Sequence, residues 1–267
     1  MDIRDKYIVL TGATGGIGRA IARKLSSDGA RLILVARNEQ RLAALIDEMD
    51  GNDHIAVPAD LSLHEGRQRV LEACNMIGGS GVSLLINSAG ITEFEMFEKQ
   101  SPDAIQNLLE INLLSPILLI QALLPLIAKQ QDGRIINIGS TFGGIGYPGF
   151  STYCASKFGL RGFTEALRRE LADTNTRVSY VAPRATRTDL NSDSVVAMND
   201  ELGTTMDDPA MVANEVMQVI HGSSKTDKYI GWPEKLFVRV NALFPGIVDN
   251  SLRKQLPTIR RFARAKI

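Results

Sequence analysis

The sequence has little cysteine, and its cysteines are not arranged for chemistry. Among 267 residues only Cys74 and Cys154 occur, with no C-x-x-C pair. This excludes a disulfide framework and is typical of a reducing compartment. The histidines, His54, His64 and His221, are scattered, and no acid–histidine spacing predicts a metal site. We therefore expect no metal.

The chain also lacks a net charge and a long apolar run. It holds 30 basic and 30 acidic residues, so no global field attracts nucleic acid. The most apolar run, residues 113–128, is interrupted by Pro116 and Pro125 and is shorter than a membrane span. The charged residues 1–6 do not resemble the start of a signal peptide, so we expect a cytoplasmic protein.

Short apolar runs alternate with stretches of helical periodicity. With 44% hydrophobic residues, the chain can bury the core of one domain. We expect strands near 7–11, 31–36, 54–58, 83–87, 134–139, 177–181 and 228–231, and helices near 17–28, 39–49, 64–77, 102–129, 152–173 and 209–221. The alternation predicts an α/β fold, a doubly wound parallel sheet of about seven strands with helices on both faces. Residues 183–209 are expected to form a loop over the site.

A glycine-rich turn follows the first predicted strand. The stretch Thr11-Gly12-Ala13-Thr14-Gly15-Gly16-Ile17-Gly18 joins an apolar run to a helical pattern. Such a turn lets backbone N–H groups approach a pyrophosphate, and the helix dipole favours its negative charge. The spacing is G-x-x-x-G-x-G, not the general G-x-G-x-x-G. The strand before it and the helix after it favour a nucleotide site over tight packing alone.

A second cluster consists of Tyr153 and Lys157, with Ser140 upstream. Positions i and i+4 share a helix face, so the ammonium can lie near the phenol. A free tyrosine has a pKa near 10 and is a poor acid or base at neutral pH. A lysine charge a few Å away contributes up to about 4 kcal/mol. We therefore expect Tyr153 to have a lowered pKa and to exchange protons at working pH, although such a pair also occurs by chance as mere packing.

Together these motifs resemble the short-chain dehydrogenase/reductase family, in its single-domain oxidoreductase branch. The resemblance covers about residues 5–232 and rests on Thr11-Gly12-x-x-x-Gly16-Ile17-Gly18, Asn87-Ser88-Ala89-Gly90, Asn112, Ser140 and Tyr153-x-x-x-Lys157. It implies a Rossmann fold and hydride transfer between a nicotinamide cofactor and a carbonyl or alcohol. It implies much less about the substrate.

The resemblance also implies catalytic roles. Tyr153 would protonate the carbonyl oxygen during reduction, and Ser140 would hydrogen-bond the same oxygen. Lys157 would lower the pKa of Tyr153 and hold the nicotinamide ribose. Asn112 would anchor a water that connects Lys157 to solvent. The expected catalytic residues are therefore Asn112, Ser140, Tyr153 and Lys157.

The expected cofactor contacts lie at the carboxyl ends of the predicted strands, where ligands bind in such sheets. They are Gly12, Thr14, Gly15, Gly16, Ile17, Gly18, Arg37, Asp60, Leu61, Asn87, Ala89, Gly90, Tyr153, Lys157, Pro183, Thr186 and Thr188. Asp60 matches the family's adenine contact, although an Asp after a strand is also an ordinary helix cap. Arg184 stands where the family usually has glycine, and it would contact a cofactor phosphate or an anionic substrate group.

The end of the second predicted strand indicates which cofactor is preferred. An acidic residue about 20 positions after the glycines would bind the ribose 2′-hydroxyl and repel a 2′-phosphate. Ala36 and Arg37 occupy that place, and a guanidinium is suited to pair with the phosphate. We therefore expect NADP(H) to be preferred over NAD(H). The alternative is an exposed arginine that merely opens a loop.

The predicted substrate is a lipophilic ketone, aldehyde or 3-oxoacyl group, as in lipid metabolism. Candidate pocket residues are largely apolar: Phe94, Met96, Phe97, Phe142, Ile145, Tyr147, Phe150, Val195, Val196, Met198, Leu202 and Met206. One alternative function is a nucleotide-sugar epimerase or dehydratase, because Gly12, Gly15 and Gly18 also satisfy G-x-x-G-x-x-G. The chain lacks residues for the second substrate domain of such enzymes. The other alternative is a non-catalytic NADP(H)-binding protein.

Residues 233–267 are expected to extend the domain formed by residues 1–232. Basic residues near the end are Arg253, Lys254, Arg260, Arg261, Arg264 and Lys266, and apolar residues are Leu236, Phe237, Val240, Leu243, Phe244, Leu252, Leu256, Ile259 and Phe262. Pro245 and Pro257 are expected to break this extension into short pieces. It would pack on the domain, on a neighbouring subunit or on an anionic membrane.

The predicted helices near 102–129 and 152–173 carry more apolar residues than one sheet face needs. Relatives of the family pair these two helices across a two-fold axis. We therefore expect a homodimer or a homotetramer.

Overall fold

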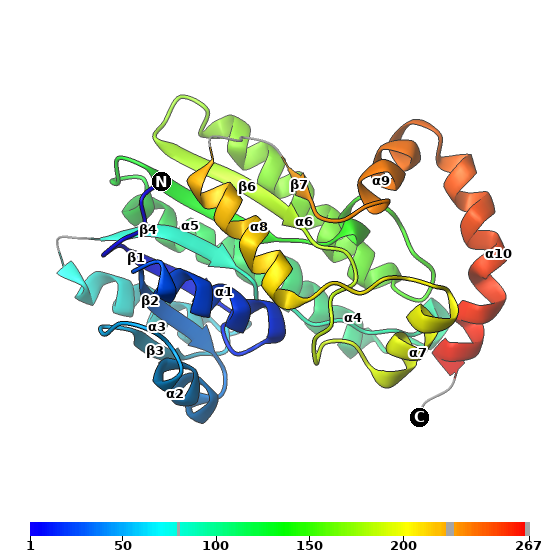
Figure 1. Cartoon of the computed structure of the whole chain (residues 1–267), viewed down its shortest axis with the longest axis horizontal. Helices are drawn as coiled ribbons and strands as arrows, with labels where there is room; N and C mark the ends of the chain where they lie inside the picture. Colours follow the sequence, from blue (N-terminus) through cyan, green and yellow to red (C-terminus); the bar gives the residue numbers. More distant parts are fainter. Residues whose placement is uncertain (79–80, 223–226, 265–267) are drawn as a thin grey trace.

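A parallel sheet of seven strands forms the centre of the molecule (Figure 1). The computed structural model describes residues 1–78, 81–222 and 227–264. The strands are β1 (Tyr7–Thr11), β2 (Arg31–Ala36), β3 (Ile55–Pro58), β4 (Val82–Asn87), β5 (Gly133–Ile138), β6 (Thr176–Ala182) and β7 (Lys228–Tyr229). Their order is β3-β2-β1-β4-β5-β6-β7, with parallel pairing throughout. The predicted doubly wound sheet is confirmed.

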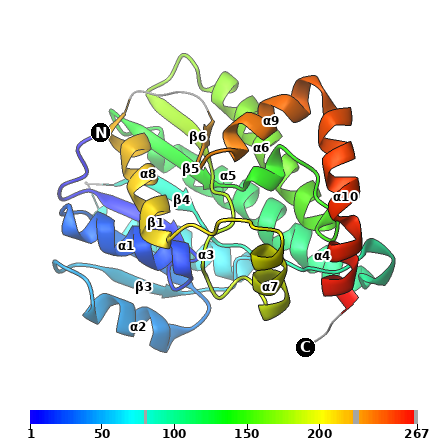
Figure 2. The same cartoon turned by 45° about the vertical axis from the view of Figure 1, so that its right-hand side comes forward.

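Helices cover both faces of the sheet (Figures 1 and 2). They are α1 (Gly16–Ser27), α2 (Glu39–Asp47), α3 (His64–Met76), α4 (Pro102–Leu109), α5 (Ser115–Ile127), α6 (Ser151–Glu170), α7 (Asp193–Glu201), α8 (Pro209–His221), α9 (Glu234–Leu243) and α10 (Pro245–Arg264). Successive strand residues face opposite ways. Ile8 and Leu10 therefore join the core under α1 and α8, whereas Val9 joins the core under α3 and α5.

The predicted helix near 102–129 contains a change of helical type. A π-helical turn, η3 (Glu110–Leu114), lies between α4 and α5 and carries Asn112. Such turns occur frequently at functional sites. The stretch Pro102–Ile127 is long and apolar enough to cross a membrane by length and composition. In the structure Leu119, Leu123 and Ile127 of α5 are fully buried against the sheet, which accounts for part of that apolar character.

The stretch after β6 is more ordered than predicted. Residues 183–209 were expected to be a loop, but α7 (Asp193–Glu201) lies within them. Val195 and Met198, three residues apart, turn one face of α7 toward Phe150 and are buried there. The prediction was wrong because the apolar residues of α7 form one short run, 195–198, which shows no helical periodicity.

The C-terminal extension forms two helices, not short pieces. Pro245 is the first residue of α10, a position where the backbone N–H that proline lacks has no helical partner. Pro257 lies inside α10 without ending it. Pro257 is exposed, so water can bind the backbone carbonyl that loses its helical partner. Burial of Val248 and Ile259 on the opposite side stabilises the helix through the proline. Lys266 lies outside the described residues.

Candidate active site

The glycine-rich turn after β1 lies against the turn after β4. Thr11 Oγ1 accepts hydrogen bonds from the backbone N–H groups of Ser88 and Ala89, each at 3.1 Å. Gly12 has φ +64, and a Cβ there would lie 2.7 Å from the Ala89 backbone. Only glycine meets both conditions. The two turns are thereby fixed side by side at the start of α1.

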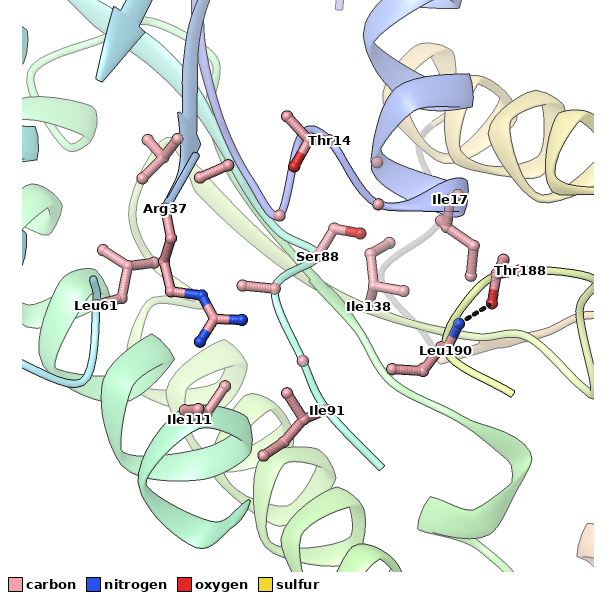
Figure 3. A pocket seen from close by; sticks show the side chains of 18 of the residues that line it. Thr14, Ile17, Arg37, Leu61, Ser88, Ile91, Ile111, Ile138, Thr188 and Leu190 are labelled. Carbon is pink, nitrogen blue, oxygen red and sulfur yellow. Dashed lines mark hydrogen bonds between the residues drawn. The ribbon is translucent and has the colours of Figure 1, made fainter. Parts of the chain in front are cut away.

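A first cavity opens over these turns and the carboxyl ends of β2 and β3 (Figure 3). It is lined by most of the predicted cofactor contacts: Gly12, Thr14, Gly15, Gly16, Ile17, Gly18, Arg37, Asp60, Leu61, Ala89, Gly90, Tyr153, Lys157 and Thr188. Arg37 and Leu61 lie on one side, and Ile17 and Thr188 lie on the other (Figure 3). The N-terminus of α1 also borders the cavity, where its dipole favours an anion.

Three predicted cofactor contacts do not line this cavity. The Asn87 amide is buried and donates to Asn137 Oδ1 at 2.9 Å. Pro183 and Thr186 line a second, adjoining cavity. Asn87 therefore belongs to an interior polar network, and the sequence pattern had no means of indicating which way its side chain turns.

Arg37 extends from the end of β2 across the first cavity (Figure 3). Within the described ranges its exposed guanidinium has no hydrogen bond or ion pair. Nearby, Asp60 accepts hydrogen bonds from the Ser62 hydroxyl at 2.7 Å and the Ser62 N–H at 3.0 Å. The hydroxyl bond is the main cause of the lowered pKa of Asp60, and the Arg37 charge adds to it. Sequence reasoning missed Arg41, which donates to the Thr14 carbonyl at 3.2 Å.

The second cavity shares Ile17, Gly139, Tyr153, Thr188 and Leu190 with the first. Of the predicted pocket residues, it is lined by Phe142, Tyr147, Phe150, Val195 and Met198. Phe142 stacks on Tyr147 with ring centroids 4.9 Å apart. The remaining lining includes the polar residues Thr92, Asn191, Asn199 and Thr204. The lining surface is nevertheless largely apolar, as predicted, and these polar groups lie among the apolar ones.

Seven predicted pocket residues lie elsewhere: Phe94, Met96, Phe97, Ile145, Val196, Leu202 and Met206. Phe94 and Leu202 pack behind the aromatic wall. Phe97 and Val196 are exposed, and Met206 is buried in the protein interior. Apolar character alone could not separate residues that line a cavity from those that support it.

Tyr153 borders both cavities, with Ser140 and Lys157 close by. Burial raises the pKa of the Tyr153 phenol to about 12, and a hydrogen bond with Ser140 acts in the opposite direction. The Lys157 ammonium lies 5.6 Å from the Tyr153 ring centroid and donates to the Ile138 carbonyl at 3.3 Å. Burial lowers the pKa of Lys157 to about 8. The expected lowering of the Tyr153 pKa was wrong, because burial removes the hydration that a phenolate needs.

Asn112 is almost fully buried and lines neither cavity. Its Oδ1 accepts from the Ile91 N–H at 2.8 Å, and its amide donates to the Ile91 carbonyl at 2.8 Å and to Ser156 Oγ at 3.3 Å. A Cβ on Gly90 would lie 3.2 Å from Asn112 Oδ1 and 3.6 Å from Lys157 Nζ. Asn112 therefore holds the backbone beside Lys157, and its role in anchoring a water stays a prediction.

Tyr180 is a supporting residue that sequence reasoning missed. Its buried hydroxyl lies 3.2 Å from the N–H and the carbonyl of Ser140 and 3.3 Å from the Lys157 carbonyl. A Cβ on Gly139 would lie 1.9 Å from the Tyr180 ring, so the small residue makes room for it. In the sequence, Tyr180 looked like an ordinary core residue of an apolar strand.

Arg184 forms ion pairs with two carboxylates of the same chain. It donates to Asp207 at 2.6 Å and to Glu234 at 3.2 Å, and it also donates to the Trp232 carbonyl at 2.9 Å. These hydrogen bonds, chiefly those with Asp207, raise the pKa of Arg184. Its charge is thus neutralised within the chain, which argues against the expected contact with a cofactor phosphate or an anionic substrate.

Comparisons with known proteins agree with this geometry. The family model described as short chain dehydrogenase matches residues 6–199. The 3-oxoacyl-[acyl-carrier-protein] reductase of Bos taurus is 37% identical over 198 residues, covering 74% of this chain and 81% of the relative. The dehydrogenase/reductase SDR family member 7B of Bos taurus is 30% identical over 260 residues, covering 92% of this chain and 79% of the relative.

A solved structure has the same fold. A short chain dehydrogenase from Burkholderia cenocepacia J2315, in complex with NADP, superposes with a TM-score of 0.79 at 22% identity. The match covers 94% of this chain and 99% of that one. The fold therefore extends through the helices that follow the region of the family match.

Proposed function

Because the chain belongs to the short-chain dehydrogenase family, we propose that it is an NADP(H)-dependent oxidoreductase that interconverts a carbonyl and an alcohol, with Tyr153 as the acid and base. The family match makes it an oxidoreductase. The observation that carries the finer assignment is that Tyr153 borders both cavities beside Ser140 and Lys157. One cavity has the lining expected for a nucleotide, and the other has room for a substrate.

The residues of the first cavity fit a nicotinamide dinucleotide. Backbone N–H groups at the start of α1 would hold the pyrophosphate, and Asp60 with Leu61 would contact the adenine. A Cβ at Gly16 would lie 2.5 Å from Thr188, so only glycine lets these two segments meet beside the phosphate site. The bound cofactor would supply the hydride.

Preference for NADP(H) is supported by Arg37. Its guanidinium reaches the cavity without a partner among the described residues, and no acidic residue takes the place after β2 where a ribose 2′-hydroxyl would be bound. A 2′-phosphate would give this charge a bidentate partner.

The protonation states suit carbonyl reduction. With a pKa of about 12, Tyr153 keeps its proton at neutral pH and can donate it to a carbonyl oxygen. Lys157 stays charged below pH about 8 and would stabilise the phenolate that remains after proton transfer. Ser140 would donate a hydrogen bond to the developing oxyanion.

The substrate we propose is a lipophilic ketone, aldehyde or 3-oxoacyl compound. The stacked rings of Phe142 and Tyr147 offer an apolar wall, and Asn199 and Thr204 offer polar groups in the same cavity. A compound with an apolar chain and a polar linkage near its carbonyl would use both. The 37% identity with a 3-oxoacyl-[acyl-carrier-protein] reductase makes 3-oxoacyl thioesters the first compounds to test.

We also propose a cytoplasmic homodimer or homotetramer. Ala155, Phe158 and Gly162 are exposed along one side of α6, and Leu114 is exposed beside it on the neighbouring helix. A second copy would cover these residues. Both cysteines are free, which is compatible with the cytoplasm.

The test is an activity screen of the purified protein with NADPH against 3-oxoacyl thioesters, aliphatic and steroid-like ketones, aldehydes and sugars. NADPH oxidation is followed by absorbance. Tyr153→Phe should lower turnover about 10² to 10⁴-fold, as for lost acid–base catalysis, while NADPH binding stays nearly intact. Tyr147→Phe is the matched control, because it removes a hydroxyl from the wall of the same cavity. Near-normal turnover of Tyr153→Phe would contradict the assignment.

A further inference from the structure

Helix α9 follows β7 and lies toward the outer edge of the molecule (Figures 1 and 2). The helix and the residues flanking it expose an apolar patch. The apolar patch consists of Trp232, Leu236, Phe237, Leu243, Phe244 and Ile247, all exposed. Leu243 is 72% exposed and Trp232 is 69% exposed. Single exposed apolar residues are common, but six of them within residues 232–247, half of them aromatic, indicate an interaction surface.

The apolar patch arises because α9 is apolar on two sides. Val238 is buried, and the Asn241 amide, three residues on, donates to the Gly144 carbonyl at 3.0 Å. This side faces the protein. Leu236 and Leu243, seven residues apart, share the opposite side and face water. A surface helix is normally polar on its outer side, so this outer side is suited to a non-aqueous partner.

The neighbouring helix α10 exposes a basic face. Its apolar residues Leu252, Leu256, Ile259 and Phe262, for which packing on the domain was one of the expected alternatives, are turned wholly or partly inward. Arg253, Lys254, Arg260 and Arg264 are exposed, and none makes an ion pair among the residues that the structure describes. Lys235 and Arg239 of α9 are exposed as well. Lys235 and Arg239 thus lie on the same helix as the apolar patch, and the basic face continues along α10 to Arg264.

We propose that the apolar patch and the basic face dock the protein on an anionic lipid bilayer. Aromatic and leucine side chains would enter the interface between headgroups and acyl chains, and the arginines and lysines would pair with anionic headgroups. An exposed apolar patch alone, or a basic face alone, is weak evidence for membrane binding. Here the two lie on neighbouring helices, and peripheral membrane binding requires both. The helix pair would then hold the second cavity close to the bilayer, because Gln255 of α10 contacts Tyr147 in the cavity wall at 3.3 Å.

Charge argues against a second copy of the chain as the occupant. In a two-fold symmetric contact the same surface meets itself. The basic face of one copy would then approach that of the other, and like charges repel. Residues 232–264 contain only two acidic side chains, and one of them, Glu234, is already paired with Arg184. An anionic bilayer has the complementary charge.

The chain contains one tryptophan, and it lies in the apolar patch. Trp232 fluorescence is therefore a specific probe of docking. Vesicles of phosphatidylcholine with phosphatidylglycerol, at low salt, should shift the emission to shorter wavelength and protect it from an aqueous quencher. Vesicles of phosphatidylcholine alone should have little effect, and added salt should reverse the shift.

Variants tested by co-sedimentation with the same vesicles separate the contribution of the apolar patch to binding from that of the basic face. The double change Leu243→Gln and Phe244→Gln should weaken binding at least about tenfold. Arg253→Gln and Lys254→Gln should each weaken it about fivefold at low salt. Met76→Gln, at an exposed position of α3, and Lys129→Gln are the matched controls and should bind normally. Thermal unfolding and circular dichroism establish that each variant is folded, so the test does not depend on enzymatic activity.

Three results would overturn the proposal. The first is no binding of the intact protein to anionic vesicles at low salt. The second is equal binding to vesicles of neutral lipid. The third is a smaller particle for the Leu243 and Phe244 variant in lipid-free solution, measured by light scattering, because the apolar patch would then be an interface between copies of the chain.

Discussion

Tyr153 is partly buried and Lys157 is buried, and burial moves their pKa values in opposite directions. It raises the pKa of the phenol to about 12 and lowers that of the ammonium to about 8. Each shift favours the neutral form, as expected for groups with little hydration. Under the proposed mechanism the site would begin a cycle with a protonated Tyr153, which is the form that carbonyl reduction would need. Alcohol oxidation needs the phenolate and should be slow at neutral pH.

A pH dependence follows from these two values. The Lys157 charge is present below pH about 8 and is lost above it, since its pKa is lowered from 10.5. Tyr153 keeps its proton over the whole range. We expect kcat/KM for carbonyl reduction to be level below pH about 8 and to fall above it, because kcat/KM reports the groups of the free enzyme. Steady-state kinetics with NADPH measure this.

The variant Lys157→Met is the control for the pH dependence. It should have a low kcat/KM without the fall above pH about 8, since the titrating group is gone. A value of kcat/KM that rises from pH 8 to about pH 10 in the unaltered protein would instead indicate that Tyr153 must ionise first.

A second residue-scale prediction concerns Arg37. Arg37→Ala should cost about 1.5 to 3 kcal/mol of NADPH affinity, as for a lost hydrogen bond to a charged group, and should leave NADH affinity little changed. Arg41→Ala is a useful comparison, because Arg41 donates to the Thr14 backbone and should affect both nucleotides alike. Fluorescence titration with each nucleotide gives the affinities. Equal losses for both nucleotides in Arg37→Ala would show that Arg37 is only structural.

Single residues also mark the limit of what the sequence predicts. Spacing indicated that Tyr153 and Lys157 share a helix face, and the structure brings both to the first cavity. Spacing could not indicate that burial would raise the pKa of Tyr153, because burial depends on the whole fold. The role of Tyr180 and the partner of Arg184 could not be predicted for a similar reason, because Ser140 and Asp207 are distant from them in the sequence.

At the scale of elements, strands and buried helices were predictable, and the cover of the second cavity was not. Parallel strands buried on both faces give continuous apolar runs, which were located within one or two residues. The apolar residues of α7 form one short run without helical periodicity, and α10 contains Pro257 in its interior. Both helices are held by contacts with each other and with the aromatic cluster around Phe150. Local patterns do not encode such contacts.

Ile259 of α10 is fully buried in that cluster. Ile259→Ala should therefore destabilise the fold by about 2 to 5 kcal/mol through the cavity it leaves. We expect a raised KM for the carbonyl substrate, since α10 supports the wall of the second cavity through Tyr147. NADPH affinity should be unchanged, because α9 and α10 contribute nothing to the lining of the first cavity as described. Thermal unfolding, kinetics and nucleotide titration provide the three readouts.

Ile259→Val is the matched control for this change. It removes one methylene and should cost only about 0.5 to 1.5 kcal/mol. If Ile259→Ala lowered NADPH affinity by the same factor as it raised KM, α10 would stabilise the whole site and not the second cavity alone.

At the scale of the whole molecule, two outer surfaces are more apolar than a monomer in water requires. One is the apolar patch on α9. The other runs along α6, where Ser151, Ala155, Phe158, Gly162 and Ala166 are exposed at intervals of three or four residues. Small residues at helical spacing allow two helices to approach closely. The two surfaces differ in charge, since the basic residues gather on the C-terminal helices, so we assign the α6 surface to a second copy of the chain.

Gly162 provides a sharp test of that assembly. A Cβ on Gly162 would meet no atom within 4 Å in the single chain, so a side chain there does not disturb the subunit. Replacing glycine inside a helix should even stabilise the fold by roughly 0.5 to 1 kcal/mol. In a dimer packed through α6, however, an arginine would meet the partner subunit. We therefore expect Gly162→Arg to be a folded monomer in light scattering, whereas Ala44→Arg, which adds the same charge on the exposed side of α2, should stay assembled. A Gly162→Arg protein of unchanged size would show that the copies, if they associate, do so through another surface.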